Sequence, residues 1–289
     1  MERIRATASD LPEGVAAALA SPSAPQIRKS SAGGYQFSSR AWGDPGGLPL
    51  LLVHGVTSSS ATWWRIGAAL AATGRLIVAP DLPGHGRTAG WRGRHAFAET
   101  AADLRAFCRA LEIDTPELDV VGHSWGALVS AELPAAGLAP RTIVLVDPPY
   151  LPREFFEAYV QDPEEQPYPT MAGARAAIRA ANPTWCAGDV DAKAEALTEF
   201  DVEGARAVVL ENTFDAGLAA LAEPPASGIP IWYVRGEAAS GSLIPEERVS
   251  ELQARVGVDN VLTIADGAHS PHRMHPEATL VAILRALAG

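Results

Sequence analysis

The segment from Leu118 to Ala131 constrains the fold of this chain more than any other part of the sequence. A short apolar run leads into Gly122-His123-Ser124-Trp125-Gly126, and small residues follow. This order predicts a strand, a sharp turn and a helix. The turn has no room for side chains two positions either side of the serine, which explains both glycines. Such a turn would raise the Ser124 hydroxyl at the carboxyl end of the strand, a geometry typical of a nucleophilic serine.

The rest of the sequence predicts an α/β fold. Continuous apolar runs, which suit strands buried on both faces of a parallel sheet, alternate with segments of helical spacing. This alternation predicts a mostly parallel sheet that helices cover on both faces. A looser alternation over residues 35–42 predicts an edge strand. The expected buried strands are 48–53, 75–79, 118–121, 142–146, 229–234 and 260–264, and the expected helices are 62–72, 97–111, 246–256 and 278–287.

Composition along the chain divides it into three parts. Residues 1–34 are rich in Ala, Ser, Pro and Gly, so we expect a poorly ordered leader with one helix near residues 11–20. Residues 35–149 and 228–289 carry the strand and helix alternation and form the core. Residues 150–227 contain aromatic and helical segments without a buried-strand run, which predicts a helical insertion.

Charge and cysteine content restrict the function classes. The formal net charge of −11 argues against nucleic acid and anionic membrane surfaces as partners. Two cysteines, Cys108 and Cys186, do not make a disulfide framework. The sequence starts without a secretory h-region, and no apolar run approaches the roughly 20 residues that span a bilayer. We therefore expect a cytoplasmic protein.

A nucleophilic serine needs a base that accepts its proton, and the base needs a third group to orient it. The segment 265–272 directly follows the last expected strand, and Gly267 lets this loop turn. His269 in this loop is the candidate base. We interpret His272 and His275, which lie close by, as helix or surface histidines.

Five motifs in this order resemble the α/β-hydrolase superfamily, and the match runs from about residue 35 to the end. The resemblance implies that the insertion is a cap between strands six and seven of the family's sheet. It also implies an oxyanion hole formed by the backbone N–H groups of Val56 and Trp125. The motifs are Phe37–Trp42, Leu51-Leu52-Val53-His54-Gly55, Asp81-Leu82-Pro83-Gly84-His85-Gly86, Gly122-His123-Ser124-Trp125-Gly126 and Gly267-Ala268-His269-Ser270-Pro271-His272.

The acid of the expected triad has two candidates. Many members of the superfamily place it in a Gly-x-x-Asp loop after the strand at 229–234, but here Ala239 stands at that position. Glu237 is the only carboxylate in the loop before Glu246. The alternative is Asp147, at the end of the preceding strand, a placement that a minority of the superfamily uses. We favour Asp147 and keep Glu237 as the alternative.

Together these features predict a serine hydrolase that cleaves a small to medium hydrophobic carboxylic ester or lactone through an acyl-enzyme intermediate. Ser124 argues against haloalkane dehalogenases and epoxide hydrolases, whose superfamily members use aspartate there. No phosphate-binding loop, dinucleotide-binding glycine pattern or metal-ligand spacing stands out, so we expect no cofactor and no metal. Two alternatives remain: a carbon–carbon bond hydrolase acting on a dienoic or diketone substrate with the same triad, and a low-turnover ligand-binding member of the fold.

Substrate preference would depend on the cap and on side chains around the serine. Aromatic residues here could line an apolar cavity, although any one of them more often packs in a core. His54 could also brace its own loop, and His123 could support the site from behind. Arg153, Arg175 and Arg179 could form a carboxylate clamp. The pocket candidates are His54, Trp63, Trp64, His123, Phe155, Phe156, Tyr159, Trp185 and Phe214.

Overall fold

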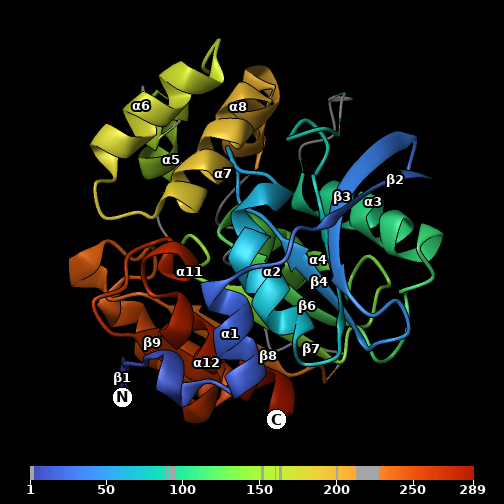
Figure 1. Cartoon of the computed structure of the whole chain (residues 1–289), viewed down its shortest axis with the longest axis vertical. Helices are drawn as coiled ribbons and strands as arrows, with labels where there is room; N and C mark the ends of the chain where they lie inside the picture. The colour runs from blue at the N-terminus through green and yellow to red at the C-terminus, as the bar shows by residue number, and fades with distance from the viewer. Residues whose placement is uncertain are drawn as a thin grey trace.

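A single twisted sheet crosses the middle of the protein in a computed structural model (Figure 1). The structure describes residues 3–88, 90, 96–150, 153–159, 161–162, 165–199, 201–212 and 228–289, with only the backbone at 153, 156, 210 and 211. Within these ranges the strand order is β2-β3-β5-β4-β6-β7-β8-β9-β1. The pairs β2·β3 and β3·β5 are antiparallel and the remaining pairs are parallel. This arrangement confirms the predicted α/β class and the mostly parallel sheet.

The strands and helices have the following bounds. The strands are β1 (Arg3–Ile4), β2 (Gln26–Ala32), β3 (Tyr35–Gly43), β4 (Pro49–Val53), β5 (Leu76–Pro80), β6 (Asp119–His123), β7 (Thr142–Val146), β8 (Ile231–Arg235) and β9 (Val261–Ile264). The helices include α1 (Glu13–Ala20), α2 (Trp64–Ala71), α3 (Phe97–Ala110), α4 (Trp125–Glu132), α5 (Arg153–Tyr159), α6 (Met171–Ala181), α7 (Ala187–Thr198), α8 (Val202–Glu211), α10 (Val249–Val256), α11 (Pro271–Met274) and α12 (Pro276–Ala288).

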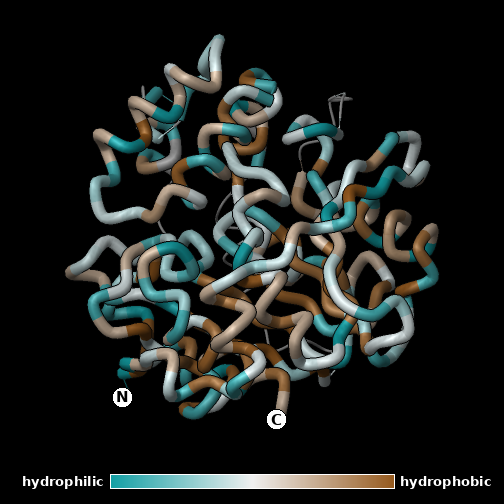
Figure 2. The backbone as a smooth tube through the Cα atoms, in the orientation of Figure 1, coloured by the Kyte–Doolittle hydropathy of each residue, from teal (hydrophilic) through white to brown (hydrophobic). Residues whose placement is uncertain are grey.

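The sheet is buried on both faces, as its continuous apolar strands require. In β4, Leu51 and Val53 pack in a cluster with side chains of α3, α4 and α10. Leu50 and Leu52 point the other way, into a cluster with side chains of α1, α2 and α12. Successive side chains of a strand face opposite sides of the sheet, so an uninterrupted apolar run fills both layers. Figure 2 shows the hydrophobic strands inside and the more hydrophilic segments around them.

The expected poorly ordered leader is wrong for the residues that the structure describes. β1 pairs with β9, and β2 pairs with β3 along its whole length. Val15 and Leu19 of α1 lie on one helix face and pack in the cluster that α2 and α12 share. The apolar spacing within α1, rather than the overall composition of this segment, therefore decides its structure. Because β2 takes the edge, β3 is an inner strand and not the edge strand expected from residues 35–42.

The helical insertion lies between β7 and β8 and carries α5, α6, α7 and α8 at the upper left of Figure 1. Counted without the two-residue β1, these strands are the sixth and seventh, as the resemblance implied. Helix α7 anchors this cap to the core. Gly188 lies against the Trp64 ring, where a Cβ atom would collide. Asp189 accepts hydrogen bonds from Trp64 Nε1 at 3.0 Å and from Arg65 Nη2 at 2.5 Å.

Candidate active site

Ser124 stands on a strained turn between β6 and α4. Its φ is 55° and its ψ is −126°, a conformation that L-residues rarely adopt. A Cβ atom at Gly122 would collide with the carbonyl of Gly126 and the hydroxyl of Ser130, and one at Gly126 would collide with the carbonyl of His54. Only glycine fits these two positions, so the local sequence enforces the turn that raises Ser124 above the sheet edge.

A chain of hydrogen bonds joins Ser124, His269 and Asp147. The Ser124 Oγ atom lies 2.9 Å from His269 Nε2, and His269 Nδ1 lies 2.8 Å from Asp147 Oδ2. Asp147 is fully buried and also accepts hydrogen bonds from Ser242 Oγ at 2.5 Å, Gly236 N at 3.1 Å and Leu243 N at 2.9 Å. These donors hold the carboxylate in one orientation, so its remaining lone pair faces the imidazole Nδ1–H.

The other candidate acid, Glu237, makes different contacts. Its carboxylate lies 3.0 Å from Arg3 Nε and accepts a hydrogen bond from Asp266 N at 3.2 Å. These contacts tie the loop after β8 to the N-terminal segment and to the loop that follows β9. Of the two candidates, the structure brings Asp147 to the imidazole of His269.

His123 supports His269 from behind. Its Nε2–H donates a hydrogen bond of 2.8 Å to the carbonyl oxygen of His269, and the two rings lie 4.9 Å apart. Burial lowers the pKa of His123 well below its ordinary value, with a smaller contribution from His269. Because the neutral His123 ring carries its proton on Nε2, its Nδ1 atom can accept a hydrogen bond from a group in the pocket.

Three further histidines lie in structural positions. His54 is fully buried: its Nδ1–H donates to the carbonyl of Gly55 at 2.8 Å and its Nε2 accepts from Leu82 N at 3.0 Å. Burial lowers the pKa of His54 to about 4, so the ring is neutral at pH 7. His272 packs on Trp63 at 5.0 Å between ring centroids, and His275 bonds the carbonyl of Asp266 at 3.2 Å.

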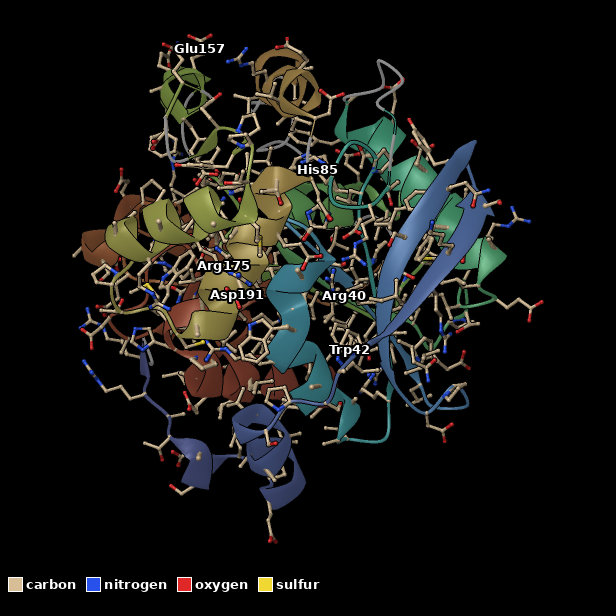
Figure 3. The ribbon with its side chains drawn as sticks, turned by 45° about the horizontal axis from the view of Figure 1, so that its top comes forward. Arg40, Trp42, His85, Glu157, Arg175 and Asp191 are labelled. Carbon is tan, nitrogen blue, oxygen red and sulfur yellow. The ribbon has the colours of Figure 1, made fainter. Side chains whose placement is uncertain are left out.

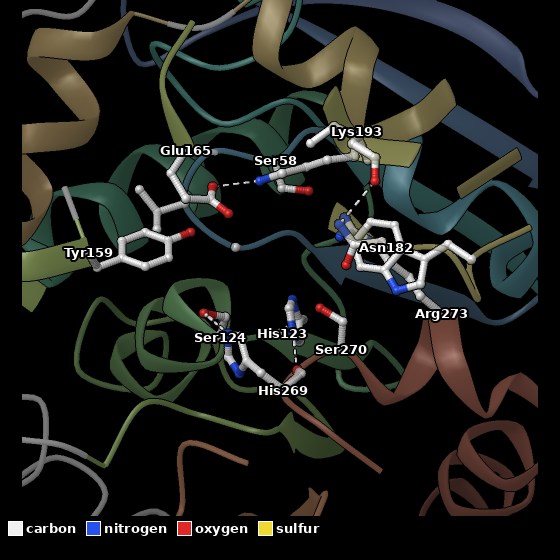
Figure 4. A pocket seen from close by; sticks show the side chains of 14 residues that line it. Ser58, His123, Ser124, Tyr159, Glu165, Asn182, Lys193, His269, Ser270 and Arg273 are labelled. Carbon is white, nitrogen blue, oxygen red and sulfur yellow. Dashed lines mark hydrogen bonds and ion pairs between the residues drawn. The ribbon is translucent and has the colours of Figure 1, made fainter. Parts of the chain in front are cut away.

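Two connected cavities meet at Ser124 and His269. The first, which we name the apolar arm, holds about 30 Å³. The second, the polar arm, is larger at about 160 Å³ and extends under the cap (Figure 4). Main side chains of the apolar arm are Val56, Trp125, Phe155, Val208, Val209 and Leu243. Polar side chains that line the polar arm are Ser58, Glu165, Asn182, Lys193, Ser270 and Arg273.

The predicted pocket residues divide between these arms and the core. His123, Tyr159 and Trp185 line the polar arm, and Phe155 lines the apolar arm. Phe214 and the side chain of Phe156 lie outside the described residues.

Three pocket predictions are wrong. Trp63 is buried in the core beside His272, and Trp64 faces α7, because η2 (Ser60–Trp63) and α2 turn these rings away from Ser124. His54 is buried beneath its loop by the two backbone hydrogen bonds described above.

Of the three arginines suggested as a carboxylate clamp, the two with described side chains make their contacts within the cap. Arg175 pairs with Asp191 at 2.7 Å between α6 and α7 (Figure 3), and neither side chain lines the two arms. Arg179 donates to the carbonyl of Trp185. The side chain of Arg153 lies outside the described residues.

The charged groups that do line the site were not found from the sequence. Lys193 Nζ lies 2.6 Å from Glu165 Oε2 and donates to the carbonyl of Thr57 at 3.1 Å. Burial raises the pKa of Glu165, but the charge and hydrogen bond of Lys193, together with hydrogen bonds from Thr57 and Tyr159, bring the pKa below its ordinary value. The sequence signal available for this pair was a single lysine within the helix α7, which no spacing rule singles out.

The two backbone groups expected for an oxyanion hole lie beside the serine. Val56 borders both arms, and Trp125 borders the apolar arm. Trp125 is the first residue of α4, and an N–H in the first turn of a helix has no intrahelical acceptor. Both positions are compatible with donors to an oxygen bound next to Ser124.

No group of three or more potential metal-ligating side chains of His, Cys, Asp or Glu comes together within the described residues. None of the helices in these ranges combines the length and the apolar character that crossing a bilayer requires.

The sheet order, the serine turn and the cap between β7 and β8 together define an α/β-hydrolase fold. Residues 50–282 match the model of the alpha/beta hydrolase family. The chain therefore belongs to the alpha/beta hydrolase family.

Individual relatives are more distant. The chain is 38% identical over 119 residues to the dihydrolipoyllysine-residue acetyltransferase component of the acetoin cleaving system of Pseudomonas putida, covering 41% of this chain and 31% of that protein. The chain spans about a third of the length of the first curated relatives that it matches. It is 27% identical over 259 residues to lipase LipV of Mycobacterium tuberculosis, covering 86% of this chain and 96% of the lipase.

Among solved structures, E-2-(acetamidomethylene)succinate hydrolase is similar with a TM-score of 0.76 and 22% identity, covering 92% of this chain and 100% of that one. At this identity the likeness shows the fold and leaves the substrate open.

Proposed function

We propose that this hydrolase cleaves carboxylic esters or lactones through an acyl-enzyme intermediate on Ser124, without a cofactor. The observation that carries the proposal is the hydrogen-bonded chain from Ser124 Oγ through His269 to the buried carboxylate of Asp147. The similarity to a lipase, which covers 86% of this chain, supports the ester bond as the one that is cleaved.

In the proposed reaction, the Ser124 Oγ attacks the ester carbonyl carbon while its proton passes to His269 Nε2. The negative charge that develops on the carbonyl oxygen is stabilised by the N–H groups of Val56 and Trp125, and one such donor is worth roughly 10²–10³ in rate. The C–O bond then breaks, and the leaving alcohol takes the proton from His269. Water repeats the sequence on the acyl-enzyme and releases the acid.

Asp147 orients the imidazole. Its Oδ2 accepts the Nδ1–H hydrogen bond, which leaves Nε2 unprotonated and ready to receive the serine proton. The carboxylate also stabilises the imidazolium that forms during the attack. The hydrogen bond from His123 to the His269 carbonyl positions the same loop.

Hydrolysis of p-nitrophenyl esters from acetyl to octanoyl tests this proposal, with Ser124→Ala as the variant and Ser21→Ala, at the exposed end of α1, as the matched control. We expect turnover by the wild type and the control and a loss of about 10³-fold or more in the variant. Equal activity of the Ser124→Ala protein would contradict the proposal. A wild type that is inert toward every ester, while a fluorophosphonate still labels Ser124, would favour the carbon–carbon bond hydrolase instead.

A further inference from the structure

The side chains that line the polar arm include two positive charges, and only one of them is paired with a carboxylate. Lys193 and Arg273 are both more than nine-tenths buried, and both line the cavity. Glu165 forms an ion pair with Lys193 at 2.6 Å. Across the described residues, no carboxylate lies within 4.0 Å of the Arg273 guanidinium. The neighbouring Arg65 does not change this balance, because it pairs with Asp189 at 2.5 Å.

Arg273 is held rigidly by neutral contacts. Its Nε and Nη2 atoms lie 3.2 and 2.8 Å from the Thr62 hydroxyl, and the guanidinium lies 4.6 Å from the centre of the Trp185 ring. Burial lowers the pKa of Arg273, yet a guanidinium stays charged throughout the physiological range. A buried charge without a counter-ion is costly, and the cost falls when an anion binds beside it.

The cavity next to this charge has the size and the polar groups to accept an anion. Its volume of about 160 Å³ is far above the roughly 10–15 Å³ that a single water needs. Asn182, Ser58 and Ser270 line the same space, and their amide and hydroxyl groups can donate hydrogen bonds. Figure 4 shows Ser58, Asn182 and Arg273 across the arm from Ser124, and Ser270 beside His269.

From this arrangement we infer that the polar arm binds a substrate carboxylate, with Arg273 as its charged partner and Asn182 and Lys193 beside it. The planar guanidinium suits a carboxylate, because its N–H groups match the two oxygens. The inference rests on the proposed function and narrows its substrate class. The substrate is an ester with a carboxylate on one side of the scissile bond and an apolar group, in the apolar arm, on the other.

Four esters test the inference in both orientations. Mono-p-nitrophenyl glutarate carries the carboxylate on the acyl side, and p-nitrophenyl pentanoate is its neutral match. A p-carboxyphenyl pentanoate carries the carboxylate on the alcohol side, with phenyl pentanoate as its match. We expect the wild type to prefer the charged member of one pair by at least about tenfold in kcat/KM, the effect of one hydrogen bond to a charged group.

Arg273→Gln should lower this preference by at least about tenfold. Arg175→Gln, which removes an exposed cap arginine on α6, is the control and should leave the preference unchanged. A wild type that prefers both neutral esters, or an Arg273→Gln protein with the wild-type preference, would overturn the inference while the ester hydrolase proposal stands.

Binding of glutarate separates the two proposals. Calorimetric titration of glutarate into the Ser124→Ala protein needs no turnover, and neutral glutaramide serves as the control ligand. We expect glutarate to bind at least about tenfold more tightly than glutaramide. If no ester is hydrolysed but glutarate binds, the proposed function fails and the carboxylate site remains. If glutarate does not bind, the carboxylate site fails, whether or not Arg273→Gln folds.

Discussion

Replacing Asp147 by Asn tests which carboxylate acts with His269. The amide keeps the size of the side chain and removes the charge that faces His269 Nδ1 at 2.8 Å. Without the carboxylate, the imidazole loses the acceptor that fixes its tautomer and the charge that stabilises the imidazolium. The same change in serine proteases lowers kcat by about 10⁴, so we expect a loss of roughly 10³–10⁴ in kcat, which corresponds to about 4–5.5 kcal/mol.

Glu237→Gln is the matched control, because Glu237 was the alternative acid and contacts Arg3 and Asp266 instead. We expect its kcat to stay within about threefold of the wild type, since an ion pair at a partly exposed position contributes about 0–1 kcal/mol. The assay is p-nitrophenyl butyrate hydrolysis, with the fraction of active enzyme counted by fluorophosphonate titration so that any unfolded protein is excluded. Wild-type kcat in Asp147→Asn, or a collapse of kcat in Glu237→Gln, would refute the assignment.

Two further predictions concern stability. Burial lowers the pKa of His54 to about 4 against 6.5 in the unfolded chain. As the pH falls, His54 therefore takes up a proton in the unfolded chain before it does so in the folded protein. The contribution of His54 to stability is complete above pH 6.5 and decreases as the pH falls toward 4. The full size of this contribution is about 3 kcal/mol. Urea unfolding should therefore show a lower free energy of unfolding at pH 5 than at pH 7.5. If the free energy of unfolding of a His54→Gln protein depends on pH in the same way, His54 is not the cause. Gly126→Ala should destabilise the protein by about 1–3 kcal/mol and abolish esterase activity, because its Cβ atom would collide with the His54 carbonyl. The control is Gly14→Ala in α1, where a Cβ atom meets no other atom and the backbone is helical. Retained activity in Gly126→Ala would contradict the steric argument.

The parts of the fold that the sequence predicts are those that local sterics and burial dictate. Strands β4 and β7 were predictable because a strand covered on both faces must be continuously apolar. The serine turn was predictable because Gly122 and Gly126 lie where any side chain would collide. In the N-terminal segment the helix near residues 11–20 was predicted, and α1 confirms it. The strands β1 and β2 were not predicted, because the average composition of the segment suggested poor order.

Local sequence patterns could not decide between the two candidate acids, and they did not reveal the polar arm. Asp147 meets His269 only because β7 lies next to β8 and β8 next to β9, a relation that comes from the sheet order. Lys193, Glu165 and Arg273 come from three segments far apart in the sequence, and they meet only when α7 docks on the core. No spacing in the sequence links them, so the chain read alone suggested an apolar pocket.

Acylation of Ser124 is tested most directly by the mass of the intact protein, quenched in acid during turnover of p-nitrophenyl butyrate, followed by peptide mapping. We expect a butyryl group on Ser124 in the wild type and no adduct in Ser124→Ala. Hydrolysis that proceeds with no adduct at Ser124, or with the butyryl group on another residue, would contradict it.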